Sequence, residues 1–196
     1  MSREIIEDYL LETAKAFRSY KTLAEKAIEQ VSDKEFFRTI DVESNSIAAI
    51  CKHIGGNLRS RWTNFLTTDG EKSDRNRDSE FVTDNDTRES VMQFWENGFQ
   101  ILFATLESLT AEDLEKTVQI RGEDYTPLKA INRAAMHTAS HIGQIQFLAK
   151  HLRSADWETL SIPKNKSAEF NNWLSEKEDE GNYLETAREF AEKNLK

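Results

Sequence analysis

One long stretch, Thr126–Leu152, restricts the fold of this chain more than any other. Its apolar residues recur at the three- and four-residue spacing of an α-helix, and they are Leu128, Ile131, Ala135, Ile142, Ile145, Ala149 and Leu152. Thr126 is a favourable N-cap, and Pro127 suits the first helical position, where the backbone needs no N–H. The stretch therefore predicts one amphipathic helix of about seven turns, at a rise of ~1.5 Å per residue.

Two histidines lie at the edge of that apolar stripe. His137 and His141 are four residues apart, so they lie on the same side of the predicted helix. Two imidazoles in this position could hold one divalent metal ion, with nitrogen–metal distances of about 2.1 Å. His151 lies roughly 15 Å further along the helix axis and cannot join the same site. Since such pairs also occur by chance, a metal site needs a third ligand from elsewhere in the chain.

The obvious third ligand is His53, on a second predicted helix. It sits just off the apolar stripe of that helix, and Asn57 follows it one turn later. Because His53 has the same edge position as the His137–His141 pair, we expect the three imidazoles to converge, with nitrogens within about 4 Å of each other. Cys51 projects to nearly the opposite side of the helix, and we expect it to be a small buried apolar residue.

Four long amphipathic segments, near residues 3–31, 44–66, 86–108 and 126–152, are joined by polar or capped breaks. This pattern predicts an all-α fold, an antiparallel four-helix bundle with an extra C-terminal helix. We expect residues 1–172 to form the bundle and residues 173–196 to be a helical extension of the same domain. We also expect a short turn after Ser32, a small strand pair within Val118–Tyr125, and a surface path for residues 157–170.

Composition excludes several classes of protein. The formal charge is −9, with 35 acidic residues against 26 Lys and Arg, which argues against nucleic-acid binding. A single Cys rules out an intramolecular disulfide and fits a reducing compartment. No apolar run approaches the roughly 18 residues of a membrane span, and the first residues are too polar for a signal peptide. We therefore expect a cytoplasmic protein without membrane contact.

Two further features concern the surface. Residues 67–84 form a long polar segment, which is either a solvated connector or a lid on which Arg75 or Arg77 meets an anionic substrate. The third long helix carries Trp95, Phe99 and Phe103 in excess of one narrow stripe. Because exposed aromatic surface usually marks an interface, we expect a homodimer.

The histidines also carry a resemblance. His53, together with the motif from His137 through His141-Ile142-Gly143-Gln144-Ile145, resembles the DinB/YfiT-like superfamily. The stretch Gly56–Lys72, with Arg75, Arg77-Asp78 and Glu80-Phe81 after it and Ser161-Ile162-Pro163-Lys164 further on, is similar to one bacterial branch of unassigned function. The resemblance covers residues 5–172.

The resemblance implies a four-helix bundle in which three imidazoles hold a divalent metal, with at least one position open. Zinc, nickel, cobalt, iron and manganese all remain possible, since imidazole suits each of them. Characterised relatives include thiol S-transferases, a thiol-dependent isomerase and metal-dependent hydrolases. Such a metal lowers the pKa of a water or of a small thiol. Asn57 and Gln144 could only hydrogen-bond, so the sequence identifies no further catalytic residue.

Three hypotheses about function remain at this point. The first is a metal-dependent enzyme that transfers a small thiol to an electrophile, or that hydrolyses its substrate. The second is a metal-binding or stress-response protein without turnover. In the third, the histidines merely pack, and function resides in residues 67–84 or in the C-terminal helix. Metal content separates the third hypothesis from the others, and turnover separates the first from the second.

Overall fold

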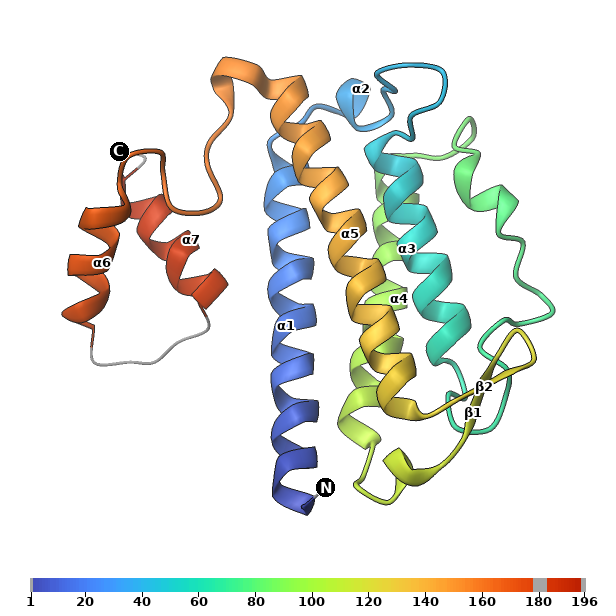
Figure 1. The fold of residues 1–196 in the computed structure, drawn as a ribbon. Coiled ribbons are helices and arrows are strands. Elements are labelled where there is room, and N and C mark those ends of the chain that lie inside the picture. Colours follow the sequence, from blue (N-terminus) through green and yellow to red (C-terminus); the bar gives the residue numbers. More distant parts are fainter. Residues whose placement is uncertain (1, 178–182, 195–196) are drawn as a thin grey trace.

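The computed structural model describes residues 2–177 and 183–194, which are mainly helical (Figure 1). Four long helices lie side by side, and they are α1 (Arg3–Glu29), α3 (Ile47–Trp62), α4 (Arg88–Ser108) and α5 (Pro127–Arg153). These helices match the four expected segments, so the all-α class is confirmed. Among the described helices, none is both long enough and apolar enough to cross a membrane.

The shorter elements connect and flank these helices. They are α2 (Asp33–Phe36), the 3-10 turns η1 (Asp78–Phe81), η2 (Asp113–Glu115) and η3 (Ser154–Asp156), the strands β1 (Val118–Ile120) and β2 (Glu123–Tyr125), and the helices α6 (Ser167–Ser175) and α7 (Tyr183–Asn194). The predicted turn after Ser32 is confirmed as a capping box that starts α2. The predicted strand pair is confirmed as an antiparallel hairpin in which Val118 lies opposite Tyr125.

The long helices form two parallel pairs. The start of α1 meets the start of α5, where the Tyr9 hydroxyl donates to Asn132 Oδ1 at 2.7 Å. The C-terminal ends of α3 and α4 meet where the Thr105 hydroxyl donates to the Trp62 carbonyl at 3.1 Å. Helices α1 and α5 run in one direction, and α3 and α4 run in the opposite direction, as the colours in Figure 1 show. This arrangement differs from the antiparallel order of successive helices expected from the sequence.

The segment between α3 and α4 explains this difference. Residues 63–87 return along the side of α3, where the Lys52 ammonium donates to the Val82 carbonyl at 2.7 Å and pairs with Asp86 at 2.6 Å. Helix α4 therefore begins beside the first turns of α3 and runs in the same direction. Helix α3 has only 16 residues, so a connecting segment of this length can run back along its whole side.

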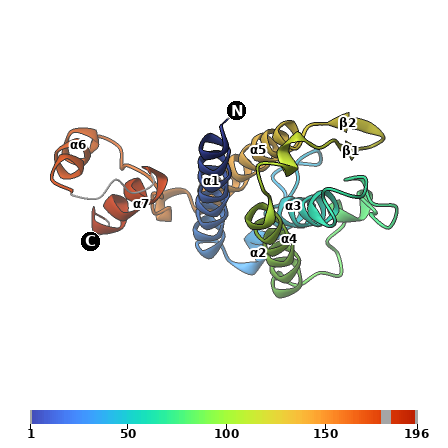
Figure 2. The same ribbon diagram turned by 90° about the horizontal axis from the view of Figure 1, so that it is seen from below.

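One apolar core occupies the space between the four helices, which surround it in the end-on view of Figure 2. Each helix contributes large side chains that are almost completely buried, and they include Phe17, Ile54, Leu58, Trp62, Trp95, Phe99, Leu102, Ile131, Ile142 and Ile145. This core holds α3 and α5 in place, and these are the two helices that carry the histidines.

The aromatic residues of α4 belong to this core. Trp95 and Phe99 are fully buried, and Phe103 is partly buried beneath the Arg18 guanidinium, 4.3 Å from the ring centroid. The expectation of an exposed aromatic surface is therefore wrong for Trp95 and Phe99, because α4 packs against both α1 and α3 and needs a wide apolar face. The homodimer stays a prediction, which the aromatic residues of α4 no longer support.

The C-terminal helices α6 and α7 lie beside α1, on the side away from α3, in both Figure 1 and Figure 2. They share a small apolar cluster of Phe170, Ala187 and Phe190. Helix α6 was not expected, and it spans the boundary predicted at residue 172. The sequence places Tyr183, Leu184 and Leu195 on the apolar face of the last helix, but these side chains lie outside the described part of the chain.

Helices α3 and α4 approach closely at a pair of glycines. A Cβ atom added at Gly98 would lie 2.7 Å from the Gly55 carbonyl oxygen and 2.9 Å from the Gly55 Cα. Both atoms belong to helical backbone and cannot move aside independently. At Gly143, on the exposed side of α5, an added Cβ would meet nothing within 4 Å.

We therefore expect Gly98→Ala to destabilise the protein by about 1–3 kcal/mol, because it overpacks the contact between the two helices. The matched control Gly143→Ala should stabilise it by roughly 0.5–1 kcal/mol, since alanine loses less backbone entropy in a helix. Urea unfolding followed by circular dichroism measures both values. Equal effects of the two substitutions would contradict the close approach of α3 and α4.

Candidate metal centre

The three predicted histidines converge between α3 and α5. His53 Nε2 lies 3.2 Å from His137 Nε2. One ligand nitrogen from each of His53, His137 and His141 can be chosen so that all three lie within 4.8 Å of one another. This spread is slightly wider than the value of about 4 Å that we expected. The group could hold one metal ion.

A carboxylate fixes the orientation of the first histidine. His53 Nδ1 lies 2.8 Å from Oε2 of Glu80, and both side chains are almost fully buried. Because an ionised carboxylate only accepts hydrogen bonds, the His53 proton resides on Nδ1. The Nε2 lone pair then points towards His137. Carboxylate–histidine pairs of this kind orient metal ligands in proteins and raise their basicity.

Glu80 is itself held by an arginine. Arg75 donates from Nε to Glu80 Oε1 at 2.8 Å and from Nη2 to Glu80 Oε2 at 3.0 Å. Its third nitrogen, Nη1, donates to Glu71 at 3.3 Å. Arg75 is therefore occupied in supporting Glu80, and only Arg77 of the two predicted arginines is exposed at the centre. Arg77 lies over the Phe81 ring, which in turn stacks on His53.

A glycine provides the space that Glu80 needs. A Cβ atom at Gly56 would collide with the carboxylate of Glu80. Residues 67–84 are thus not a solvated connector throughout, because their 3-10 turn η1 packs against α3 and buries Glu80. The sequence gives no sign of the contact between Glu80 and His53, since residues 67–84 have no periodicity that would place Glu80 next to α3.

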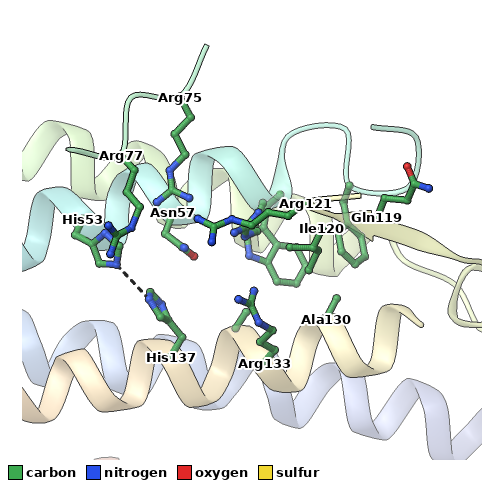
Figure 3. Close-up of a pocket in the computed structure, with 14 residues that line it drawn as sticks. His53, Asn57, Arg75, Arg77, Gln119, Ile120, Arg121, Ala130, Arg133 and His137 are labelled. Atoms are coloured by element: carbon green, nitrogen blue, oxygen red, sulfur yellow. Dashed lines mark hydrogen bonds between the residues drawn. The ribbon is translucent and has the colours of Figure 1, made fainter. Parts of the chain in front are cut away.

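Gln144, which the sequence predicts only as a hydrogen-bonding residue, orients His141. His141 Nδ1 lies 2.7 Å from Oε1 of Gln144, one turn further along α5. With the amide oxygen as acceptor, the His141 proton resides on Nδ1 and Nε2 carries the lone pair. Asn57 faces the space beside His53 in Figure 3. Cys51 is fully buried away from the histidines, and burial raises the pKa of its thiol, as expected for a structural residue.

The electrostatic environment favours neutral imidazoles. Burial lowers the pKa of His137 to about 3, and the proximity of His141, His53 and Arg133 acts in the same direction. Burial also lowers the pKa of His141, and the hydrogen bond that His141 donates to Gln144 opposes this by raising it. Burial alone would raise the pKa of Glu80, but the hydrogen bonds from His53 and Arg75 lower it below its usual value. Neutral imidazoles beside an ionised carboxylate are the state that metal binding requires.

A cavity of about 190 Å³ adjoins His53 and His137. It lies between α3, α5 and the β1–β2 hairpin (Figure 3). Arg61 and Arg133 line it, and sequence reasoning missed both. Their spacing could have indicated them, because Arg61 lies two turns after His53 and Arg133 one turn before His137.

Comparison with known proteins assigns most of the chain to one family. The family described as "Protein of unknown function (DUF1572)" matches residues 4–166. The chain belongs to this family. The DUF1572 match includes all three histidines and Glu80, and it ends immediately before α6. No curated protein and no solved structure matches the chain.

The shifted pKa of His137 predicts how acid affects the metal-free DUF1572 protein. In the unfolded chain a histidine has a pKa of about 6.5, whereas in the folded protein the pKa of His137 is about 3. Between these values the unfolded state binds the additional proton, so this contribution to stability is complete above pH ~6.5 and is lost as the pH falls towards ~3.

We expect His137→Gln to flatten the decline in stability on acidification, because glutamine does not titrate. Urea midpoints measured from pH 7 to pH 4 with a chelator present compare the variant with the wild-type chain. Parallel profiles for the two proteins would contradict a neutral, half-buried His137.

Proposed function

We propose that His53, His137 and His141 hold a divalent first-row metal ion, and that the protein is a metal-dependent enzyme acting on a small thiol or on water. The observation that supports this most is the convergence of the three imidazole nitrogens from two helices. Two of the rings are also oriented by hydrogen bonds that their Nδ1–H groups donate, to Glu80 and to Gln144.

A divalent ion held by three neutral imidazoles keeps its full charge and lowers the pKa of a thiol or water at an open position. The chain's own groups would then keep the site in its reactive form. Glu80 and Arg75 would hold the His53 ring, and the cavity beside His53 and His137 would admit the substrate.

Thiol transfer is the reaction we favour over hydrolysis. Among the described residues that line the cavity, none is acidic, so no side-chain carboxylate there can act as a general base. A free thiol has a pKa of about 8.5, so a shift of one or two units ionises it at neutral pH. Bulk water, with a pKa of 15.7, needs a far larger shift. A small thiol and an electrophile are therefore the proposed substrates.

We also propose that the four long helices form the four-helix bundle of the DinB/YfiT-like superfamily. The position of the histidines on the second and fourth long helices supports this relation, as does the His141-Ile142-Gly143-Gln144-Ile145 motif. The alternative function is a non-catalytic metal-binding or stress-response protein, which would use the same three ligands. The homodimer and the cytoplasmic location are further predictions from the sequence.

Metal content is the first measurement. Protein purified without a His-tag should contain about one equivalent of a divalent metal, since three imidazoles form one site. His137→Ala should lose most of it, and His151→Ala should not, because His151 lies outside the group. Elemental analysis by mass spectrometry measures both. Metal-free wild-type protein that binds neither zinc, nickel, cobalt, iron nor manganese would refute the metal centre.

The contact between Glu80 and His53 predicts that metal affinity weakens, without being abolished, when this contact is removed. Glu80→Gln should weaken metal binding by about 10–100-fold, the usual cost of removing an outer partner of a ligand histidine. Gly56→Ala should weaken it in the same direction, since its methyl group displaces the Glu80 side chain. The control Asp74→Asn removes a carboxylate from the same segment, at an exposed position that pairs with Arg59. Competition with a fluorescent chelator gives the affinities, and equal values for all three variants would contradict the role of Glu80.

Turnover separates the two functions. The metal-free protein is loaded with zinc, nickel, cobalt or manganese and given a small thiol with a chlorinated aromatic compound or an epoxide. Ester and amide hydrolysis are followed in parallel. We expect metal-dependent thiol consumption that His141→Ala abolishes. If every metal form binds its ion and remains inert, the non-catalytic alternative replaces the enzyme.

A further inference from the structure

Five arginines line the cavity beside the histidines, in a chain whose formal charge is −9. They are Arg61, Arg75, Arg77, Arg121 and Arg133. Within the described part of the chain, the only carboxylates in ion pairs with these arginines are Glu71 and Glu80. The cavity is therefore strongly positive, which is opposite to the protein as a whole. Such a local field attracts anions.

Arg61 is the most informative of the five. It projects from the last turns of α3 and is only 7% exposed. Its Nη2 pairs with Glu71 at 2.9 Å, but Nε and Nη1 are buried and have no hydrogen-bond partner. Leaving buried donors of a charged group unsatisfied is costly, so an acceptor is expected at this position.

Arg121 is held in place by its turn. Arg121 and Gly122 have φ angles of 57° and 74°, as in the tight hairpin turns that match the twist of two strands. Both backbone N–H groups donate to the Asp69 carboxylate, at 2.8 and 2.7 Å. The turn is therefore fixed, and the Arg121 side chain extends into the cavity in Figure 3.

Arg133 faces the cavity from the opposite wall, on α5. No carboxylate among the described residues forms an ion pair with it. It is exposed, so its substitution need not disturb the fold. Arg75 differs from these three, because all its nitrogens are bound to Glu80 and Glu71.

We propose that Arg61, Arg121 and Arg133 bind the acidic group of a small organic anion whose other end reaches the histidines. Guanidinium groups suit carboxylate and phosphate oxygens in charge and in geometry. Along the helices, Arg133 lies about 6 Å from His137, and Arg61 about 12 Å from His53. We therefore expect the acidic group of the ligand to lie roughly 6–12 Å from its reacting group. For the reacting end, this inference rests on the proposed metal-dependent function.

The test uses the full chain without metal, so that it does not depend on the metal centre. Succinate, inorganic phosphate and the neutral analogue succinamide are titrated by calorimetry in a chloride-free buffer of constant ionic strength. We expect saturable binding of succinate or phosphate and none of succinamide. The preferred anion then distinguishes a carboxylate-bearing substrate from a phosphate-bearing one.

Variants locate the binding. Arg133→Gln and Arg121→Gln should each weaken anion binding by about tenfold or more, the value expected for a lost charge-assisted hydrogen bond. Arg59→Gln is the matched control, since Arg59 is on α3, is exposed and does not line this cavity. Its effect should stay below about twofold, as for other exposed ion pairs. Arg61→Gln is a secondary variant, because it also removes a partner from Glu71.

The absence of saturable anion binding, or equal weakening by Arg59→Gln and Arg133→Gln, would overturn this inference. Anion binding by a protein that binds no metal would retain the anion site and remove the proposed metal-dependent reaction. Metal binding without anion binding would remove the anion site alone.

Discussion

The hydrogen bond between His53 and Glu80 connects the helical core to the chemistry proposed here. Glu80 comes from the segment that follows α3, and it reaches His53 only because Gly56 leaves room beside the helix. The same segment returns along α3 and determines where α4 begins. The segment that carries Glu80 thus sets both the direction of α4 and the orientation of the His53 ring. Burying this charge is tolerated because Arg75 binds both of its oxygens.

The distribution of charge is the second constraint. Acidic residues outnumber basic ones over the whole chain, yet arginines gather around the cavity next to the histidines. At one end the imidazole nitrogens converge, and at the other the buried Nε and Nη1 of Arg61 have no partner among the described residues, which is costly unless an acceptor satisfies them. A cation among the histidines and an anion among the arginines would satisfy both ends. The two proposals are therefore complementary in charge, although separate experiments test them.

Much of the fold could be predicted from residue spacing alone. The four long helices follow from apolar periodicity and caps, and the triad follows from the four-residue separation of His137 and His141 with His53 at a matching edge position. The position of Glu80 could not be predicted, since it depends on the path of an irregular segment. The parallel direction of α3 and α4 was missed for the same reason. Trp95 and Phe99 were misjudged because a helix packed on two neighbours needs a wider apolar face than one narrow stripe.

The direct test of the central claim is to count the ligands of a bound metal by X-ray absorption spectroscopy. The zinc- or cobalt-loaded protein should show three imidazole nitrogens at about 2.0–2.1 Å, and one fewer after His53→Ala. Such a spectrum would establish that the three histidines bind the ion together. A coordination shell made only of oxygen atoms, or one that does not change in His53→Ala, would contradict the account.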